Sequence, residues 1–227
     1  MPSPIIVTPK FPALDDSLFH LVRIAGAIAG ASESTTRTIM ERAVGSVDPI
    51  AVDEVIIQSY LFCGFPRTLN AARTWRAVSG EAAPASDPSA EIRNSDDWER
   101  QGGQTCEIVY GESYQLLREN IRKLHPALDS WMITDGYGKV LSRPQLDLPT
   151  RELCIVAACA ATGQQRQLHS HLHGALNSGV SQATLTSTLD ALASLIGESE
   201  LAQCRSLLSH VLSKRHPPKS SAPASGN

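Results

Sequence analysis

Side chains that could do chemistry gather in the segment 137–180, and His171 is the first of them. Its imidazole lies in the run QLHSHLHGALN, and histidine is the side chain best suited to moving protons near neutral pH. Glu152 precedes it by one predicted helix, where a carboxylate could hydrogen-bond to the ring. We therefore predict that His171 is a catalytic proton donor and Glu152 a catalytic partner. The alternative is that His171 only completes a hydrogen bond in the core.

Two more histidines flank His171 in the same run. His169 and His173 are four residues apart, so on a helix they share one face and could bind a metal ion. His171 points away from that face, which leaves the pair without a third ligand. We predict no metal site here and two histidines that face solvent.

Arg143 and Arg151 form a second constellation. Arg151 opens a predicted helix, where a cation is unfavourable beside the N-terminal dipole, so an acid must be close to it. That acid could be a substrate carboxylate or an internal one. We predict that Arg143 or Arg151 anchors a substrate carboxylate. The alternative is a surface pair between Arg143 and Glu152, worth about 0 to 1 kcal/mol.

Tyr137 and Asn177 are further candidates for substrate binding through hydrogen bonds. Tyr137 stands between Gly136 and Gly138 and could present its phenol to a ligand. Glycine on both sides is also what a tight turn requires, and the turn is the interpretation that we favour.

The elements that must position these residues are helices. From Thr150 onward, apolar residues recur with helical spacing, and Asp147 and Pro149 are typical of a helix start. Gly179 can end a second helix with a left-handed cap. Ser181 can begin a third. No segment shows the alternation of a strand, so the fold class is all-α.

An internal repeat relates the two halves of the chain. Segments 47–64 (VDPIAVDEVIIQSYLFCG) and 180–197 (VSQATLTSTLDALASLIG) share a capping residue, an apolar stripe and a closing glycine. Upstream, the small-residue helix expected at 18–32 stands where 153–163 stands in the second half. We predict a duplicated helical bundle in which both halves pack as one domain around a pseudo-twofold axis.

The two repeats differ in the residues that could take part in catalysis. The Gly-Phe-Pro turn at 64–66 has no counterpart in the second repeat, while Thr38 or Ile39 stands where the second repeat has His171. We infer that the halves have divided the labour, with at most one functional site per chain.

Three segments of the chain resemble the carboxymuconolactone decarboxylase family. The core of the resemblance is 137–180 (YGKVLSRPQLDLPTRELCIVAACAATGQQRQLHSHLHGALNSGV). Segment 98–131 is similar to the lead-in of the family, and 60–75 (YLFCGFPRTLNAARTW) is similar to its closing helix. The resemblance implies the all-α fold of the alkyl hydroperoxidase D-like superfamily, with His171 on the position that the family fills with histidine.

The resemblance also implies a reaction. Decarboxylation of a lactone-bearing carboxylate in aromatic-compound catabolism needs donors for the enolate charge and an acid to protonate carbon, but no metal or other cofactor. A thiol peroxidase, as in the branch of the superfamily with a CxxC motif, is the alternative. In that branch cysteines precede the histidine by seven and four residues, but this chain has Gln164 and Gln167 there. A non-catalytic helical oligomer is the third possibility.

Assembly and partners are also implied. Single-repeat relatives resemble the units of ring-like hexamers, so two-repeat chains should form a homo-oligomer, a trimer that is a pseudo-hexamer. A formal net charge of −3 offers no basic field for nucleic acid. No apolar run approaches the roughly 20 residues that cross a bilayer. We therefore expect a small-molecule substrate, no nucleic acid, no membrane and a cytoplasmic location.

The cysteines predict neither disulfides nor a zinc site, because they are odd in number and form no CxxC pair. Since most lie in apolar helices, we expect an activity that does not depend on thiols.

Composition shifts divide the chain into four parts. We predict a degenerate N-terminal repeat at 1–78, a linker at 79–95 and a C-terminal repeat at 96–213. A disordered tail rich in Pro and Ser is expected at 214–227.

Overall fold

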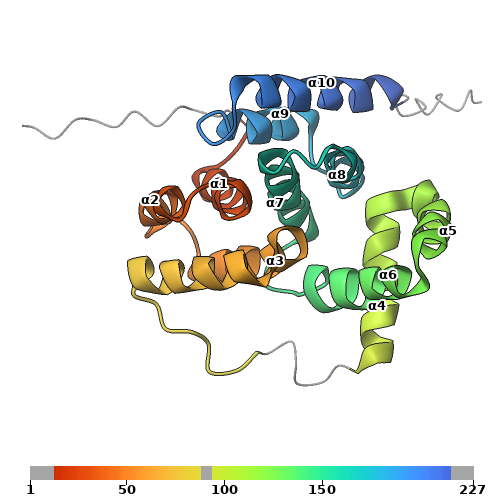
Figure 1. Ribbon diagram of the computed structural model, residues 1–227, viewed down its shortest axis with the longest axis horizontal. Helices are drawn as coiled ribbons and strands as arrows, with labels where there is room; N and C mark the ends of the chain where they lie inside the picture. The colour runs from red at the N-terminus through yellow and green to blue at the C-terminus, as the bar shows by residue number, and fades with distance from the viewer. Residues whose placement is uncertain (1–12, 88–93, 216–227) are drawn as a thin grey trace, which may run out of the picture.

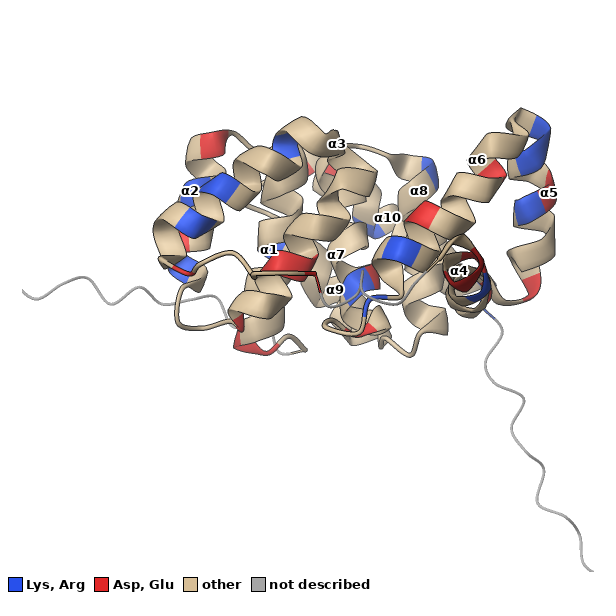
Figure 2. Cartoon of the chain, turned by 90° about the horizontal axis from the view of Figure 1, so that it is seen from below, with Lys and Arg blue, Asp and Glu red and all other residues tan. Residues whose placement is uncertain are grey.

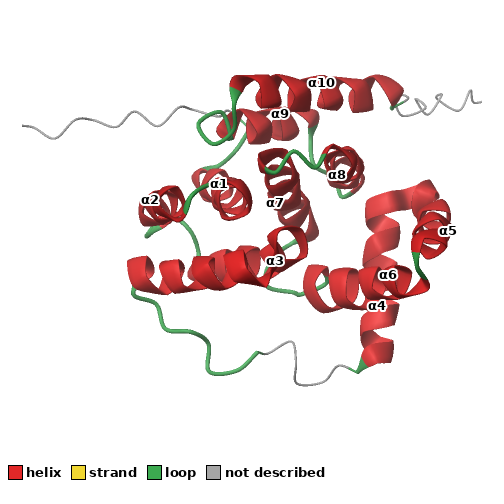
Figure 3. Ribbon diagram, viewed as in Figure 1, coloured by secondary structure: helices red, strands yellow, loops and turns green. Residues whose placement is uncertain are grey.

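The structure, a computed structural model, describes residues 13–87 and 94–215, and within these ranges it contains helices and no strand (Figures 1 and 3). The all-α prediction is therefore confirmed. The helices of the first half are α1 (Asp16–Gly30), α2 (Glu33–Ala43) and α3 (Pro49–Ser79). Those of the second half are α4 (Ser95–Tyr110), η1 (Gly111–Ser113), α5 (Tyr114–Leu124), α6 (Pro126–Trp131), η2 (Met132–Leu141), α7 (Leu148–Ala161), α8 (Gln165–Asn177), α9 (Gln182–Ala191) and α10 (Glu198–Lys214).

Helix starts follow local capping chemistry. The Asp147 carboxylate accepts a hydrogen bond from the backbone N–H of Thr150 and begins α7, as its sequence predicts. Ser181 caps α9 through the N–H of Thr184. Gly179 has φ of +100°, the left-handed conformation that separates α8 from α9. These short-range signals set the boundaries of the two helices that flank α8.

Both halves contribute to one hydrophobic core. In Figure 1, α1 and α7 lie side by side at the centre, with α3 across one side of them and α9 and α10 on the other. The core residues run continuously from Leu21 in α1 to Val211 in α10. α4 and η2 pack on each other at the edge of this core, beside α5 and α6. The shared core agrees with the expectation that the two halves pack together.

The order of the helices follows the predicted repeat. α1, α2 and the first part of α3 have α7, α8 and α9 as counterparts in order, and the second part of α3 has α10. Gly64, with φ of +77° and ψ of +164°, divides α3 into these two parts. In the second half, a break between α9 and α10 lies at the corresponding place. The duplication itself stays a prediction.

The preferred turn at Gly136-Tyr137-Gly138 is wrong, because these residues lie inside the π-helical segment η2. Gly138 is needed for a different reason. A Cβ atom there would lie 2.1 Å from the carbonyl oxygen of Trp98 in α4, so only glycine permits this approach. Gly102 of α4 approaches η2 in the same way, since a Cβ atom added there would lie 2.0 Å from the carbonyl oxygen of Ile133.

The predicted linker and tail lie partly outside the described residues. α3 ends at Ser79, Gly80 follows in the left-handed conformation, and no helix occurs at 80–87. Residues 88–93 of the linker and 216–227 of the tail are outside the described ranges.

Candidate functional site

A buried carboxylate and a buried imidazole meet between α7 and α8. The Nδ1 atom of His171 lies 2.9 Å from Oε2 of Glu152, a hydrogen-bond distance. Glu152 is 0% exposed and His171 is 6% exposed. A carboxylate acceptor places the ring proton on Nδ1, which leaves Nε2 as the atom that can meet a ligand. The structure therefore brings together the two residues predicted to be catalytic.

The surroundings of Glu152 leave one of its oxygen atoms unused. Within the described residues, Oε1 is buried and has no hydrogen-bond partner. Gly174 makes room for the carboxyl group, since a Cβ there would lie 2.6 Å from Oε2. A buried acceptor without a donor is costly, by about 1 to 3 kcal/mol. This oxygen is thus a place where a water molecule would be stabilised.

A residue from the first half of the chain packs against His171. The ring of Phe62, in α3 just before Gly64, packs edge-on against the imidazole with 5.8 Å between ring centroids. Gln164 donates from Nε2 to the carbonyl oxygen of Phe62 at 3.3 Å. The second-half histidine and the segment next to the first-half Gly-Phe-Pro sequence therefore lie side by side.

Tyr137 lies on the other side of Glu152, inside the core. Its ring packs edge-on against that of Tyr110, with centroids 6.3 Å apart. Burial raises the pKa of Tyr137 well above 10, and Tyr110 and the Glu152 carboxylate raise it further. Burial also raises the pKa of Tyr110 to about 12. Both phenols stay protonated at neutral pH and can donate hydrogen bonds next to the carboxylate.

The two predicted arginines lie together, but their partner is an internal acid. Nε and Nη2 of Arg143 contact Glu54 of α3 at 2.8 to 3.0 Å, and Nη2 of Arg151 donates to the same carboxylate at 2.7 Å. Gln58 accepts from Arg151 at 3.2 Å, and Asp87 accepts from Nη1 of Arg143 at 3.0 Å. Arg151 is 0% exposed. Of the explanations open from sequence, the internal acid is the one that the structure shows.

The alternative of a surface pair between Arg143 and Glu152 is wrong. Glu152 bonds to His171 and lies in the core, and Arg143 bonds to Glu54 and Asp87 instead. Arg151 and Glu152 are adjacent in α7 and point to different partners, because neighbouring helix residues project about 100° apart.

Asn177 lies away from the carboxylate–histidine pair. Its Nδ2 donates to the carbonyl oxygen of Val109 at 2.8 Å, and its Oδ1 accepts from Arg215 at 2.8 Å. It lines a groove of about 800 Å³ between α8 and the α4–α5 connection, together with His169 and His173. The predicted substrate contact at Asn177 therefore faces this groove, on the side of α8 away from His171.

His169 and His173 share a face of α8, as expected. Their ring centroids are 4.9 Å apart. Within the described ranges, no group of three or more metal-ligating side chains gathers here or elsewhere. Burial lowers the pKa of His173, and the neighbouring His169 and Arg215 lower it further.

The cysteines are protonated, packed residues. Burial raises the pKa of Cys106, Cys154 and Cys159 to about 12, and it also raises the pKa of Cys63 and Cys204. A thiol of this kind supplies almost no thiolate, the form that attacks a peroxide.

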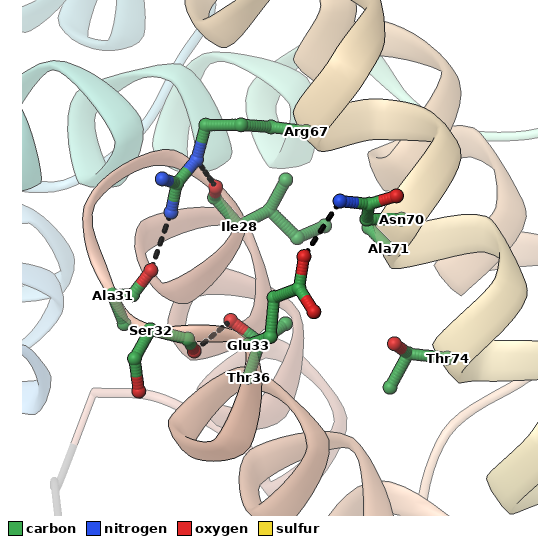
Figure 4. Close-up of a pocket in the computed structure, with 9 residues that line it drawn as sticks. All are labelled: Ile28, Ala31, Ser32, Glu33, Thr36, Arg67, Asn70, Ala71 and Thr74. Carbon is green, nitrogen blue, oxygen red and sulfur yellow. Dashed lines mark hydrogen bonds between the residues drawn. The ribbon is translucent and has the colours of Figure 1, made fainter.

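A small pocket of about 120 Å³ between α1, α2 and α3 is closed by its own hydrogen bonds (Figure 4). Arg67 donates to the carbonyl oxygens of Ile28 and Ala31, which are otherwise unsatisfied at the end of α1. Asn70 donates to Glu33 at 2.6 Å. Since these polar groups satisfy one another, we regard this pocket as a junction between helices.

Sequence reasoning missed Glu54, Gln58 and Phe62. They lie four residues apart along one face of α3 and join the arginine cluster to the histidine. The signal was present, because Glu54 and Gln58 interrupt an otherwise apolar run in the segment treated as a simple stripe. A buried charge almost always has a partner, which pointed to Arg143 or Arg151.

Surface charge and hydropathy add little to the site. Figure 2 shows basic and acidic residues interspersed over the visible helices. In the described ranges, no helix has the length and apolar character needed to cross a membrane.

A family model and curated relatives match this chain. The sequence model of the carboxymuconolactone decarboxylase family matches residues 130–208, which contain Glu152 and His171. Peroxisomal protein 2 of Schizosaccharomyces pombe is 30% identical over 150 residues, a match that covers 65% of this chain and 69% of the relative. 4-carboxymuconolactone decarboxylase of Acinetobacter baylyi is 30% identical over 87 residues, covering 38% of this chain and 65% of that enzyme.

The fold and the site together define an all-α protein with a buried carboxylate–histidine pair between two helices. The chain belongs to the carboxymuconolactone decarboxylase family. The resemblance drawn from the sequence is thereby confirmed.

Proposed function

We propose that this protein catalyses cofactor-independent decarboxylation, or related lactone chemistry, of a small carboxylated substrate in aromatic-compound catabolism. The observation that carries the proposal is the buried hydrogen bond between Glu152 and His171, which holds an imidazole at the margin of the core with Nε2 unengaged by the described residues. The similarity to 4-carboxymuconolactone decarboxylase supports the same reaction class.

The proposed step balances without a redox partner. The carbon–carboxylate bond breaks, CO2 leaves, and the electron pair moves through the conjugated system into the lactone carbonyl. Nε2 of protonated His171 then gives its proton to carbon, and the neutral ring recovers a proton from water. Glu152 orients the ring through its hydrogen bond to Nδ1. The apolar surroundings, including Phe62, favour loss of the carboxylate charge.

Arg143 stays in the proposal as the anchor for a retained substrate carboxylate. Its two carboxylate partners differ, since Glu54 is buried and the Asp87 side chain is 47% exposed. A substrate carboxylate could take the place of Asp87 and leave the Glu54 contact intact. Arg151 would then act by holding Glu54 in place.

A thiol peroxidase is the less favoured alternative. Gln164 and Gln167 occupy the positions of the dithiol, and the described cysteines all have raised pKa values. Incubation with γ-carboxymuconolactone, and separately with a hydroperoxide and a dithiol reductant, distinguishes the two reactions. Consumption of the hydroperoxide alone would overturn the decarboxylase proposal.

His171→Gln is the decisive variant. Removing a general acid should lower the catalytic rate by about 10² to 10⁴ while the fold is kept. His169→Gln and His173→Gln, on the groove side of α8, are matched controls that should keep most of the activity. Specific activity and Tm should be measured on all three. A His171→Gln protein that is destabilised but fully active would show that this histidine only packs.

A cytoplasmic location is also part of the proposal. Because one relative is named a peroxisomal protein, imaging of a tagged full-length chain is the appropriate test. Import into an organelle would contradict the proposal.

A further inference from the structure

A second pocket, of about 290 Å³, lies away from the Glu152–His171 pair. None of the described residues that line it is acidic. It lies between α1, α2 and the segment after α9. Two arginines, four hydroxyl-bearing residues and two aliphatic residues line it: Arg23, Arg42, Ser34, Thr35, Thr38, Ser194, Ile39 and Leu195. Guanidinium and hydroxyl groups are donors that suit an oxyanion.

The charges of Arg23 and Arg42 are not neutralised. Neither arginine forms an ion pair within the described residues; Arg23 donates only to the carbonyl oxygen of Ala191, at 2.6 Å, and packs over the ring of Phe19. Burial lowers the pKa of Arg23, and the charge of Arg42 lowers it further. Arg23 is half-buried beside a like charge, so an anion that bridges the two guanidinium groups would be stabilised here.

Two acidic residues close in sequence to the lining of this pocket have other partners. Asp190, next to Ala191, pairs with Arg205 at 2.6 Å. Glu41 of α2 lies 3.8 Å from Arg37 on the exposed face of that helix. Neither carboxylate therefore compensates Arg23 or Arg42.

The predicted repeat relates this pocket to the His171 site. Pairing Val47 with Val180 sets Thr38 opposite His171 and Leu195 opposite Phe62. Thr38 and Leu195 both line the pocket, just as Phe62 and His171 contact each other in the second half. The pocket thus occupies the place of the catalytic site in the half that lacks the histidine.

We propose that this pocket is a binding site for a small doubly charged oxyanion, a dicarboxylate or a phosphate group, held by Arg23 and Arg42 with the Ser34 and Ser194 hydroxyls as further donors. It binds without catalysis, because no side chain in its lining is an acid or base that titrates near neutral pH. It is a second site, separate from the proposed function of Glu152 and His171.

Thermal unfolding of the full chain tests the proposal. Inorganic phosphate and succinate are titrated separately at constant ionic strength, with potassium chloride as the balancing salt. At ten times its Kd, a ligand should raise Tm by about 3 to 6 °C. The anion with the larger effect identifies the class of ligand, and potassium chloride alone should have no such effect.

Arg42→Gln provides the control on the site. Arg42 is exposed, so the variant should fold, and without ligand its Tm should not fall, because a like charge beside Arg23 is removed. Stabilisation by the anions should be lost in Arg42→Gln and kept in Arg37→Gln, which removes a charge on the same helix outside the pocket. Equal stabilisation of wild type and Arg42→Gln, or no stabilisation of wild type by either anion, would overturn the proposal.

Discussion

At the scale of single residues, Glu54 has the largest predicted effect on stability. Its carboxylate is the common partner of Arg143 and Arg151, and both guanidinium groups are buried. Glu54→Gln would leave Arg151 without a carboxylate partner and Arg143 with only the half-exposed Asp87, which should cost about 3 to 5 kcal/mol of unfolding free energy. Urea denaturation measures the difference.

Glu41→Gln is the matched control for that experiment. Its partner Arg37 and Glu41 itself are about half exposed, so the same chemical change should cost about 0 to 1 kcal/mol. Similar losses in the two variants would mean that the buried cluster contributes no more than a surface pair.

The burial of His20 predicts that the stability of the fold depends on pH. It is buried in α1, and burial lowers its pKa; the nearby Arg23 also lowers it, while Asp16 opposes the shift. The unfolded chain therefore takes up this proton at a higher pH than the folded chain. The stability contribution of neutral His20 is complete above about pH 6.5 and is lost as pH falls through the lower folded value.

Replacing the ring removes this dependence. His20→Gln should flatten the decline of Tm between about pH 6.5 and 5. His210→Gln, on the exposed side of α10, should leave the slope unchanged. An unchanged slope in His20→Gln would mean that other groups cause the decline.

At the scale of elements, the crossing of α4 and η2 depends on glycine. A Cβ at Gly102 would lie 2.0 Å from the carbonyl oxygen of Ile133, whereas one at Gly103 meets only the hydroxyl of Tyr114 at 3.4 Å. Gly102→Ala should destabilise the fold by about 1 to 3 kcal/mol, since the helices must separate. Gly103→Ala should stabilise it by up to about 1 kcal/mol through helix propensity.

The two alanine variants at these adjacent glycines can be compared directly. Chemical denaturation of both variants should shift the midpoint in opposite directions. If Gly102→Ala proved as stable as wild type, the close contact between α4 and η2 could not be present in solution.

Sequence predicted those elements whose signals are local. Asp147 and Ser181 cap the helices that they were expected to cap, because the side chain and the amides that it binds are within three residues. The π-helical segment at Tyr137 was missed. Its glycines are explained by the distant Trp98 backbone, and no local pattern carries that information.

The same distinction applies to the site. His171 and Glu152 could be paired from sequence, because α7 and α8 are consecutive and pack together. Glu54, the carboxylate that Arg143 and Arg151 share, lies in α3, about 90 residues earlier in the chain. Only the packing of α3 on α7 makes Glu54 their neighbour. The charges of the two arginines indicated that an acidic partner existed, but they did not indicate where in the sequence it lies.

At the scale of the whole molecule, apolar residues remain uncovered around α5 and α6. α5 has no buried residue, and Leu124 at its end is 72% exposed. Trp131, at the end of α6, is 60% exposed. Leu116 and Leu128 add to the same lobe, which lies at one side of the molecule in Figure 1. Large apolar side chains gathered in this way favour contact with another protein surface.

We expect a second copy of this chain to cover that surface, within the trimer that the family resemblance implies. Light scattering at micromolar concentration should give three times the chain mass of 24.4 kDa. Leu124→Glu combined with Trp131→Ser should reduce the mass to that of a monomer, because a charge would be buried in an apolar interface. Lys123→Glu, on the same helix, should leave the assembly intact. A wild-type protein that remains strictly monomeric would refute the trimer and leave Leu124 and Trp131 facing water.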